Sequence, residues 1–141
     1  MRPTQGAINV PVKAVQTSAS RPGSIAYSQF GSASGALVVY FHGVPGSTSE
    51  ASVFDQCAKE NGLSVVCLDR FSVPETLDEA AYFQSLAHEI RHITQGRTLT
   101  VVGFSVGAFV ALQTCRYLQA DVTDLHLISA AAPLEGGDFL P

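Results

Sequence analysis

The sequence feature that most constrains the fold is the segment 98–108 (TLTVVGFSVGA), which contains a G-x-S-x-G pentapeptide centred on Ser105. β-Branched residues precede the pentapeptide, and an unbroken apolar stretch suited to a helix follows it, so a sharp strand-to-helix turn is predicted. At such a turn the central residue is forced to positive φ, and strand and helix pass too closely at Gly103 and Gly107 for a Cβ atom. The strain would hold the Ser105 hydroxyl above the sheet, within reach of a base and a substrate.

The composition suits one modest domain with a large core. The chain has 141 residues, of which 46% are hydrophobic and 14% charged. Its formal net charge is −4 and its basic residues do not cluster, so nucleic acid is not an expected partner. Residues 1–10 lack the apolar core of a signal peptide, and no run approaches ~18 apolar residues, so we expect a cytoplasmic protein without membrane contact.

The cysteines are odd in number and form no C-x-x-C pattern. Cys67 and Cys115 lie in apolar contexts, which favours buried structural thiols. We therefore expect reduced thiols, in keeping with a cytoplasmic location.

Strands and helices are predicted to alternate along the chain. Strands are predicted at residues 8–17, 24–30, 36–41 and 63–68, immediately before the pentapeptide and at 125–130, and helices at 49–60, 75–95 and 106–118. The first two strands flank a Pro-Gly turn and are expected to pair in antiparallel fashion at a sheet edge, and Ser49 is a fair N-cap for the first helix. The alternation predicts an α/β fold, with a mostly parallel sheet and right-handed crossover helices.

An activated serine needs donors for the oxyanion that forms when it attacks a carbonyl group. The backbone N–H of Val106 is one candidate, because it lies at the positive end of the helix dipole. The N–H of Val44, on the loop that leaves the strand 36–41, is the natural second. If the two strands are neighbours, both loops lie at the carboxyl edge of the sheet, where ligands bind in this architecture.

Four segments resemble the α/β-hydrolase superfamily in their order and spacing. They are Tyr27-Ser28-Gln29-Phe30-Gly31, His42-Gly43-Val44-Pro45-Gly46-Ser47, Asp69-Arg70 and the pentapeptide. The H-G-x-P loop is most similar to the branch of esterases, lipases and imino-peptidases. The resemblance covers essentially the whole chain and implies that Ser105 is the nucleophile, with Val44 and Val106 as the oxyanion residues. A serine at this position, rather than an aspartate, argues against epoxide hydrolase or dehalogenase chemistry.

The resemblance ends before the catalytic triad is complete. In the family the acid normally follows the seventh strand and the histidine the eighth. This chain is expected to stop after the sixth strand, so residues 1–141 would be a partial domain that carries the nucleophile. His126 lies inside a strand pattern, and Asp138 on the following loop has no histidine to orient. Neither residue is therefore assigned to the triad.

Polar residues near the predicted oxyanion loop have structural interpretations. His42 is expected to hold the loop through hydrogen bonds, and Asp69-Arg70 to fix a loop by an ion pair or by bonds to the backbone. Residues 71–74 (FSVP) replace the glycine-rich loop that often follows such an Asp-Arg pair, so this part of the chain departs from the family pattern.

Residues 88–92 (HEIRH) match the H-E-x-x-H pattern of zinc peptidases. His88 and His92 would share one helix face, but an apolar stripe that includes Phe83 and Ile90 lies nearly opposite that face. A peptidase zinc must face a cleft, so these histidines are expected to face solvent and no metal site is predicted.

Together these features predict a serine hydrolase that acts on a carboxylic ester or a related small acyl substrate through an acyl-enzyme at Ser105, without a cofactor. No base is assigned, so the chain alone is expected to be inactive. The alternative is a non-catalytic half-domain, or pseudoenzyme, that binds a partner or ligand. The last strand, taken as apolar on both faces, should pair on one side only. Its open edge is expected to recruit a second copy of the chain or a polypeptide that completes the domain.

Overall fold

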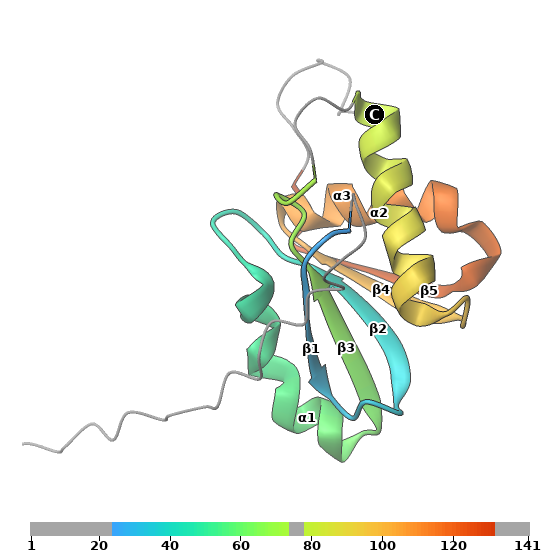
Figure 1. Cartoon of the computed structure of the whole chain (residues 1–141). Helices are drawn as coiled ribbons and strands as arrows, with labels where there is room; N and C mark the ends of the chain where they lie inside the picture. The colour runs from blue at the N-terminus through green and yellow to red at the C-terminus, as the bar shows by residue number, and fades with distance from the viewer. Residues whose placement is uncertain (1–23, 74–77, 132–141) are drawn as a thin grey trace, which may run out of the picture.

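The computed structural model describes residues 24–73 and 78–131 (Figure 1). The elements are the strands β1 (Tyr27–Gly31), β2 (Ala36–Phe41), β3 (Leu63–Leu68), β4 (Leu99–Phe104) and β5 (Val122–Ile128), the α-helices α1 (Asp55–Glu60), α2 (Glu79–Thr94) and α3 (Val106–Leu118), and the 3₁₀ helices η1 (Thr48–Phe54) and η2 (Gln119–Asp121). The predicted strand 8–17, the start of the predicted helix 75–95 and Asp138 lie outside the described residues.

The five strands form one sheet in the order β1-β3-β2-β4-β5. β2 pairs in parallel with β3 on one side and with β4 on the other, and β5 extends the parallel part beyond β4. β1 is antiparallel to β3, with Tyr27 opposite Leu68. The α-helices lie in the connections between the parallel strands, as crossover connections require. The predicted α/β class with a mostly parallel sheet is therefore confirmed.

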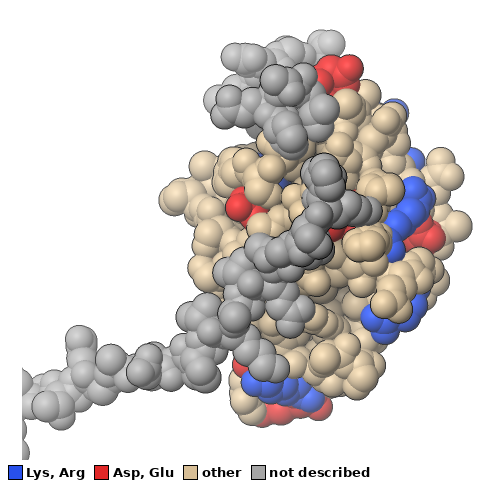
Figure 2. All heavy atoms as spheres, in the orientation of Figure 1, with Lys and Arg blue, Asp and Glu red and all other residues tan. Residues whose placement is uncertain are grey.

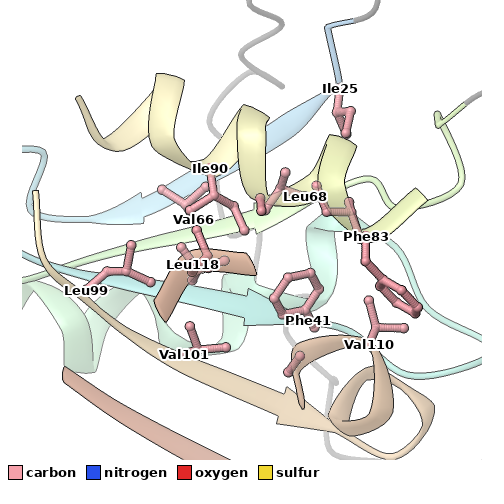
Figure 3. Packing of buried hydrophobic residues seen from close by; sticks show 14 of the residues in the cluster. Ile25, Phe41, Val66, Leu68, Phe83, Ile90, Leu99, Val101, Val110 and Leu118 are labelled. Atoms are coloured by element: carbon pink, nitrogen blue, oxygen red, sulfur yellow. The ribbon is translucent and has the colours of Figure 1, made fainter. Parts of the chain in front are cut away.

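The larger core lies between the sheet and the helices α2 and α3. Figure 3 shows Phe83 and Ile90 of α2 and Val110 of α3 among Val66 and Val101 of the sheet. Apolar residues predominate in β2 and β3, as expected of strands that are covered on both faces.

The second core lies on the opposite face of the sheet, under η1 and α1. Successive residues of a strand point to opposite faces. The side chains of Tyr40, Val65 and Cys67 therefore point away from the larger core and pack with Ala51 of η1 and Ala58 of α1. The contacts of η1 and α1 with the sheet are mainly to β1 and β3. On this face, β4 and β5 therefore receive less cover than the strands beside them.

The segment predicted as one helix, 49–60, divides into η1 and α1. The first of these begins after Ser47, so the predicted N-cap Ser49 is wrong. In η1 the Glu50 carboxylate accepts a hydrogen bond from the Tyr40 hydroxyl at 2.6 Å. This contact ties the segment to β2.

The described part of the predicted helix 75–95 is α2, which starts directly after Asp78. The Asp78 carboxylate caps the helix by accepting a hydrogen bond from the Ala81 N–H at 2.7 Å. The helix ends at Thr94, and Gly96 follows with a φ of 69°. Gln95, with a φ of 55°, already adopts the left-handed conformation, and its N–H caps the carbonyls of Arg91 and His92, so the reversal begins one residue before the predicted terminator Gly96.

β5 starts earlier in the chain than the predicted strand 125–130. β4 offers pairing as far back as Leu99, which lies opposite Val122, and the Thr123 hydroxyl donates to the Leu99 carbonyl at 3.2 Å. The strand ends before Ser129, whose φ of 47° is incompatible with an extended backbone.

β5 is an edge strand of the described sheet, and its predicted pairing with the strand before Ser105 is confirmed. The expectation that it is apolar on both faces is wrong. Leu125 packs toward the larger core, whereas Asp124 and His126 lie on the other face and are exposed. Asp124 and His126 lie on the same face of the sheet as η1 and α1, but these helices cover β1 and β3 rather than β5. β5 is therefore packed on one face only, and its polar residues alternate accordingly.

Figure 2 shows acidic and basic side chains in small separate groups on the face it presents, with uncharged residues between them. This distribution follows from the low share of charged residues, 14% of the chain. Within residues 24–73 and 78–131, no helix has the length and apolar character needed to cross a bilayer.

Candidate active site

Ser105 occupies the turn between β4 and α3. The strand ends at Phe104 and the helix begins at Val106, so Ser105 alone makes the connection. Its φ of 56° and ψ of −125° lie outside the regions that L-residues normally adopt. The predicted turn with positive φ is confirmed, and a conformation of this kind costs on the order of 1–3 kcal/mol that the surrounding structure must offset.

Gly103 and Gly107 stand where a side chain has no room. A Cβ atom on Gly103 would lie 2.6 Å from the Cα of Ala108. A Cβ atom on Gly107 would press on the carbonyl oxygen of Phe41 and would lie 2.5 Å from that of His42. Strand, turn and helix therefore fit together only with glycine at both positions, as the spacing of the pentapeptide predicted.

The backbone of Ser105 is bound to the end of β5 as well as to α3. Its N–H donates to the Ile128 carbonyl at 3.0 Å, and its carbonyl accepts from the N–H groups of Ala108 at 3.0 Å and Ala131 at 3.1 Å. The Ser105 side chain makes no capping hydrogen bond to α3, so the helix does not occupy its hydroxyl. Nothing in the local sequence signals the bonds to Ile128 and Ala131, and sequence reasoning missed them.

The H-G-x-P loop lies beside this turn. β2 and β4 are neighbours, with Phe41 paired to Gly103, so both strands end at the same edge of the sheet. The loop also approaches the serine itself, because a Cβ atom on Gly43 would lie 3.3 Å from the Cβ of Ser105. The structure therefore brings together the two loops from which an oxyanion site was predicted.

The two predicted oxyanion residues lie on these loops. Val106 is the first residue of α3, so its N–H has no carbonyl partner within the helix and sits at the positive end of the helix dipole. Val44 follows Gly43, its side chain is 57% exposed, and its peptide bond to Pro45 is cis. Two backbone N–H groups of this kind can bind a negatively charged oxygen.

Arg70 and His42 support the H-G-x-P loop. The buried Arg70 guanidinium donates from Nε to the His42 carbonyl at 3.3 Å and from Nη2 to the Gly43 carbonyl at 3.2 Å. The His42 Nδ1–H donates to the Gly43 carbonyl at 2.9 Å, while Nε2 has no partner among the described residues. The Asp69 carboxylate accepts from the Phe71 N–H at 3.1 Å. The predicted structural roles of His42 and of Asp69-Arg70 are confirmed, in the form of bonds to the backbone.

A further polar group lies under the loop. The Glu50 carboxylate accepts the hydrogen bond from Tyr40 and lies so close to Gly46 that a Cβ atom on Gly46 would be 2.6 Å from Glu50 Oε2.

Burial, with Glu50 nearby, raises the pKa of the Tyr40 hydroxyl and raises that of the Cys67 thiol to about 12. The buried thiol predicted at Cys67 is confirmed, and it stays protonated at neutral pH. Cys115 is only half-buried, and burial raises its pKa to about 11.

The other histidines lie away from this loop. His88 and His92 are exposed on α2, as the helical spacing predicted. In the described part of the chain, no group of three or more side chains is arranged to hold a metal ion. His126 is exposed on β5, opposite Val102, which agrees with its interpretation as an edge residue.

Several solved structures have a similar fold. An esterase (EaEST) from Exiguobacterium antarcticum is 25% identical, with a TM-score of 0.62 over 78% of this chain and 42% of its own. The α/β hydrolase MGS-MChE2, from a metagenome of lagoon sediments at Mar Chica, Morocco, is 20% identical, with a TM-score of 0.65 over 82% of this chain and 53% of its own. A thioesterase domain from the curacin biosynthetic pathway is 20% identical, with a TM-score of 0.65 over 89% of this chain and 50% of its own. No family model and no curated protein matches the sequence.

The chain spans about half the length of these structures. Its five-stranded, mostly parallel sheet matches the N-terminal part of their fold. The chain therefore has the fold of the N-terminal part of α/β hydrolases, as the sequence motifs had indicated.

Proposed function

We propose that the chain supplies the nucleophile part of a serine hydrolase that acts on a carboxylic ester or a related acyl substrate. The observation that carries the proposal is the backbone of Ser105, with a φ of 56° between two glycines that leave no room for a Cβ atom. Strained backbone of this kind is concentrated at active sites, where the surrounding structure enforces it. The names of two structures that share the fold, an esterase and a thioesterase domain, support the choice of acyl chemistry.

In the proposed reaction, Ser105 Oγ attacks the acyl carbonyl and the alcohol or other leaving group departs with a proton. Water then hydrolyses the ester bond between the acyl group and Ser105, which regenerates the hydroxyl. The N–H groups of Val44 and Val106 would bind the oxyanion of each tetrahedral intermediate. Both donors belong to the backbone and need no rearrangement when the charge develops.

The proton of Ser105 must pass to a base. In residues 24–73 and 78–131, no histidine ring is hydrogen-bonded to the Ser105 hydroxyl, and His42 is buried with its Nδ1–H directed to a carbonyl. We propose that a further polypeptide segment supplies the histidine and the acid of a triad. The 141-residue chain alone is then expected to hydrolyse activated esters no faster than its Ser105→Ala variant.

A fluorophosphonate probe followed by intact-mass spectrometry tests the nucleophile. The oxyanion donors would stabilise the charge that develops when Ser105 attacks the phosphorus, and the missing histidine leaves the hydroxyl unactivated, so a single adduct that forms slowly is expected on Ser105. Ser105→Ala should abolish the adduct. Ser129→Ala should retain it, which makes a matched control because Ser129 also has positive φ, 47°, and lies at the end of β5.

The second candidate is a non-catalytic half-domain that binds a partner or a ligand, and the missing base favours it. This alternative predicts no adduct that depends on Ser105. It also predicts that a segment supplying the later strands, with their aspartate and histidine, restores no ester turnover. Turnover that appears on adding such a segment and disappears in Ser105→Ala would instead establish the hydrolase.

A further inference from the structure

Arg70 is the only buried arginine among the described residues, with 7% of its surface exposed. Burying a guanidinium group is costly unless hydrogen bonds compensate for its lost hydration. The acceptors here are consecutive carbonyls of the H-G-x-P loop, His42 at 3.3 Å and Gly43 at 3.2 Å. A buried cation is thus used to hold two successive peptide groups beside Ser105.

The anchored carbonyl of Gly43 determines the direction of the next N–H. The cis bond in this loop is Val44–Pro45, so the peptide between Gly43 and Val44 is trans. In a trans peptide the C=O and the N–H point in opposite directions. The Gly43 carbonyl is directed to Arg70 and to the His42 ring, so the Val44 N–H is directed away from both.

We propose that Arg70 is a positioning residue of the oxyanion site, which aims the Val44 N–H at the space in front of Ser105. The inference rests on the proposed function, because it takes Val44 as an oxyanion donor. Gly43 connects the Arg70 contact to the serine, because a Cβ atom on Gly43 would lie 3.3 Å from the Cβ of Ser105. The positive charge of the Arg70 guanidinium beside the Gly43 carbonyl also polarises that peptide group, which makes the Val44 N–H a stronger donor.

Neighbouring residues hold Arg70 in this position. The guanidinium carbon lies 4.4 Å from the centre of the Phe71 ring, which also packs 5.6 Å from the His42 ring. The Tyr82 hydroxyl of α2 donates to the Arg70 carbonyl at 3.2 Å. The side chain is therefore fixed by stacking and its backbone by α2, which suits a residue that must orient a loop.

Arg91 provides a matched control. Its Nη2 donates to the carbonyls of Tyr117 at 2.7 Å and Leu118 at 3.3 Å, and its Nε contacts Asp121 at 2.7 Å. It also binds two consecutive carbonyls, but these lie at the last turn of α3, at the opposite end of the helix from Ser105. Its replacement tests the loss of an arginine clamp without disturbing the oxyanion loop.

The first measurement does not depend on the proposed chemistry. Backbone ¹H–¹⁵N spectra of the full chain report the environment and the solvent exchange of the Val44 N–H. We expect its signal to shift and its exchange to quicken in Arg70→Met, to recover partly in Arg70→Lys, and to stay unchanged in Arg91→Met. A Val44 signal that is the same in wild type and in folded Arg70→Met would overturn the proposal.

The second measurement is the rate of Ser105 phosphonylation by the fluorophosphonate probe, with thermal melting to verify folding. Misplacing one oxyanion donor should slow the reaction about tenfold or more in Arg70→Ala. Millimolar guanidinium should restore part of that rate, whereas Arg91→Ala should react at the wild-type rate. A purely structural role for Arg70 would give no rescue by guanidinium.

The outcomes separate the two hypotheses. If wild type labels on Ser105 and folded Arg70→Ala or Arg70→Lys labels equally fast, Arg70 does not position the site. If wild type labels on Ser105 neither alone nor with an added segment that supplies the histidine and the acid, the proposed function fails, and the Val44 signal alone then decides whether Arg70 orients the loop.

Discussion

β3 and β5 show how differently two strands of one sheet can be covered. β3 has a neighbouring strand on each side and helices on both faces, and five of its six residues are buried. β5 has β4 on one side and α3 on one face, and none of its residues is fully buried. Its sequence already reflects this difference, because Asp124 and His126 alternate with Leu125. An apolar run predicts a covered strand, whereas an interrupted run predicts a strand with one open face.

The poorly covered face is not simply polar. A groove of about 170 Å³ opens there, lined entirely by apolar surface from residues that include Tyr40, Phe54, Val102 and Ile128. The groove lies where the cover provided by η1 and α1 ends, and Ile128 at its margin is 47% exposed. The sheet therefore has a well-covered centre and an edge at β5 with exposed apolar surface. Ser105 is joined to that edge by the hydrogen bond from its N–H to the Ile128 carbonyl.

The largest expected effect compares the two strands directly. Leu68 in β3 is fully buried and Leu127 in β5 is 43% exposed. Leu68→Ala should lower the free energy of unfolding by about 3 kcal/mol, because it removes contacts and leaves a cavity, whereas Leu127→Ala should cost less than about 1 kcal/mol. Urea titration of the two variants measures the difference. Equal costs would mean that β5 is as well packed as β3.

The turn at the boundary between these regions should be the next most sensitive. Gly107→Val places a side chain against the carbonyls of Phe41 and His42, so a loss of more than about 2 kcal/mol is expected. Ser105→Ala, which removes a hydroxyl that the structure does not use for packing, should be neutral or stabilising. Denaturant midpoints of the two variants provide the test, and similar midpoints would contradict the tight turn.

The open edge of β5 should make the chain self-associate. A lysine on an edge strand opposes pairing with another strand, so Leu127→Lys should weaken association by about tenfold, or about 1.4 kcal/mol. Leu112→Lys on α3 is the matched control, since Leu112 is 44% exposed and Leu127 43%. Light scattering over a range of concentrations distinguishes the variants. A wild-type chain that stays monomeric would show that the edge recruits no second copy.

The smallest effect concerns the thiols of the covered region. Burial raises the pKa of Cys67 to about 12, so the unfolded chain, with a thiol pKa of about 8.5, loses this proton first. The stability that Cys67 contributes is complete below pH ~8.5 and declines as the pH rises toward 12, by about 1 kcal/mol between pH 8 and about 9.2.

Unfolding measured at these two pH values should show this decline in wild type and less of it in Cys67→Ala. At pH 8, a thiol reagent should modify the exposed Cys57 readily and Cys67 only on unfolding. Equal rates for the two thiols in the folded chain would contradict the burial of Cys67.

Most of the strands and the serine turn could be predicted because their signals are local. The apolar runs of β2 and β3 and the two glycines around Ser105 carry their structural reasons within a few residues. The sequence also indicated that Arg70 binds a loop, but not which one, because its acceptors depend on how β2 and β3 are placed side by side. The 3₁₀ helix at Glu50 and the bond from Ser105 to Ile128 were missed for the same reason, since both depend on tertiary contacts.

The strand order also has a consequence for folding. The chain lays β3 on one side of β2 and must then carry α2 back across the sheet before β4 can pair on the other side. The pairing of β4 with β2 joins residues far apart along the chain, so it costs loop-closure entropy and is expected to form slowly. The strained backbone of Ser105 therefore depends on the docking of β4 beside β2, which closes the longer of the two crossovers at β2. If Ser105 is the proposed nucleophile, a partly folded chain would lack the backbone geometry on which its reactivity depends.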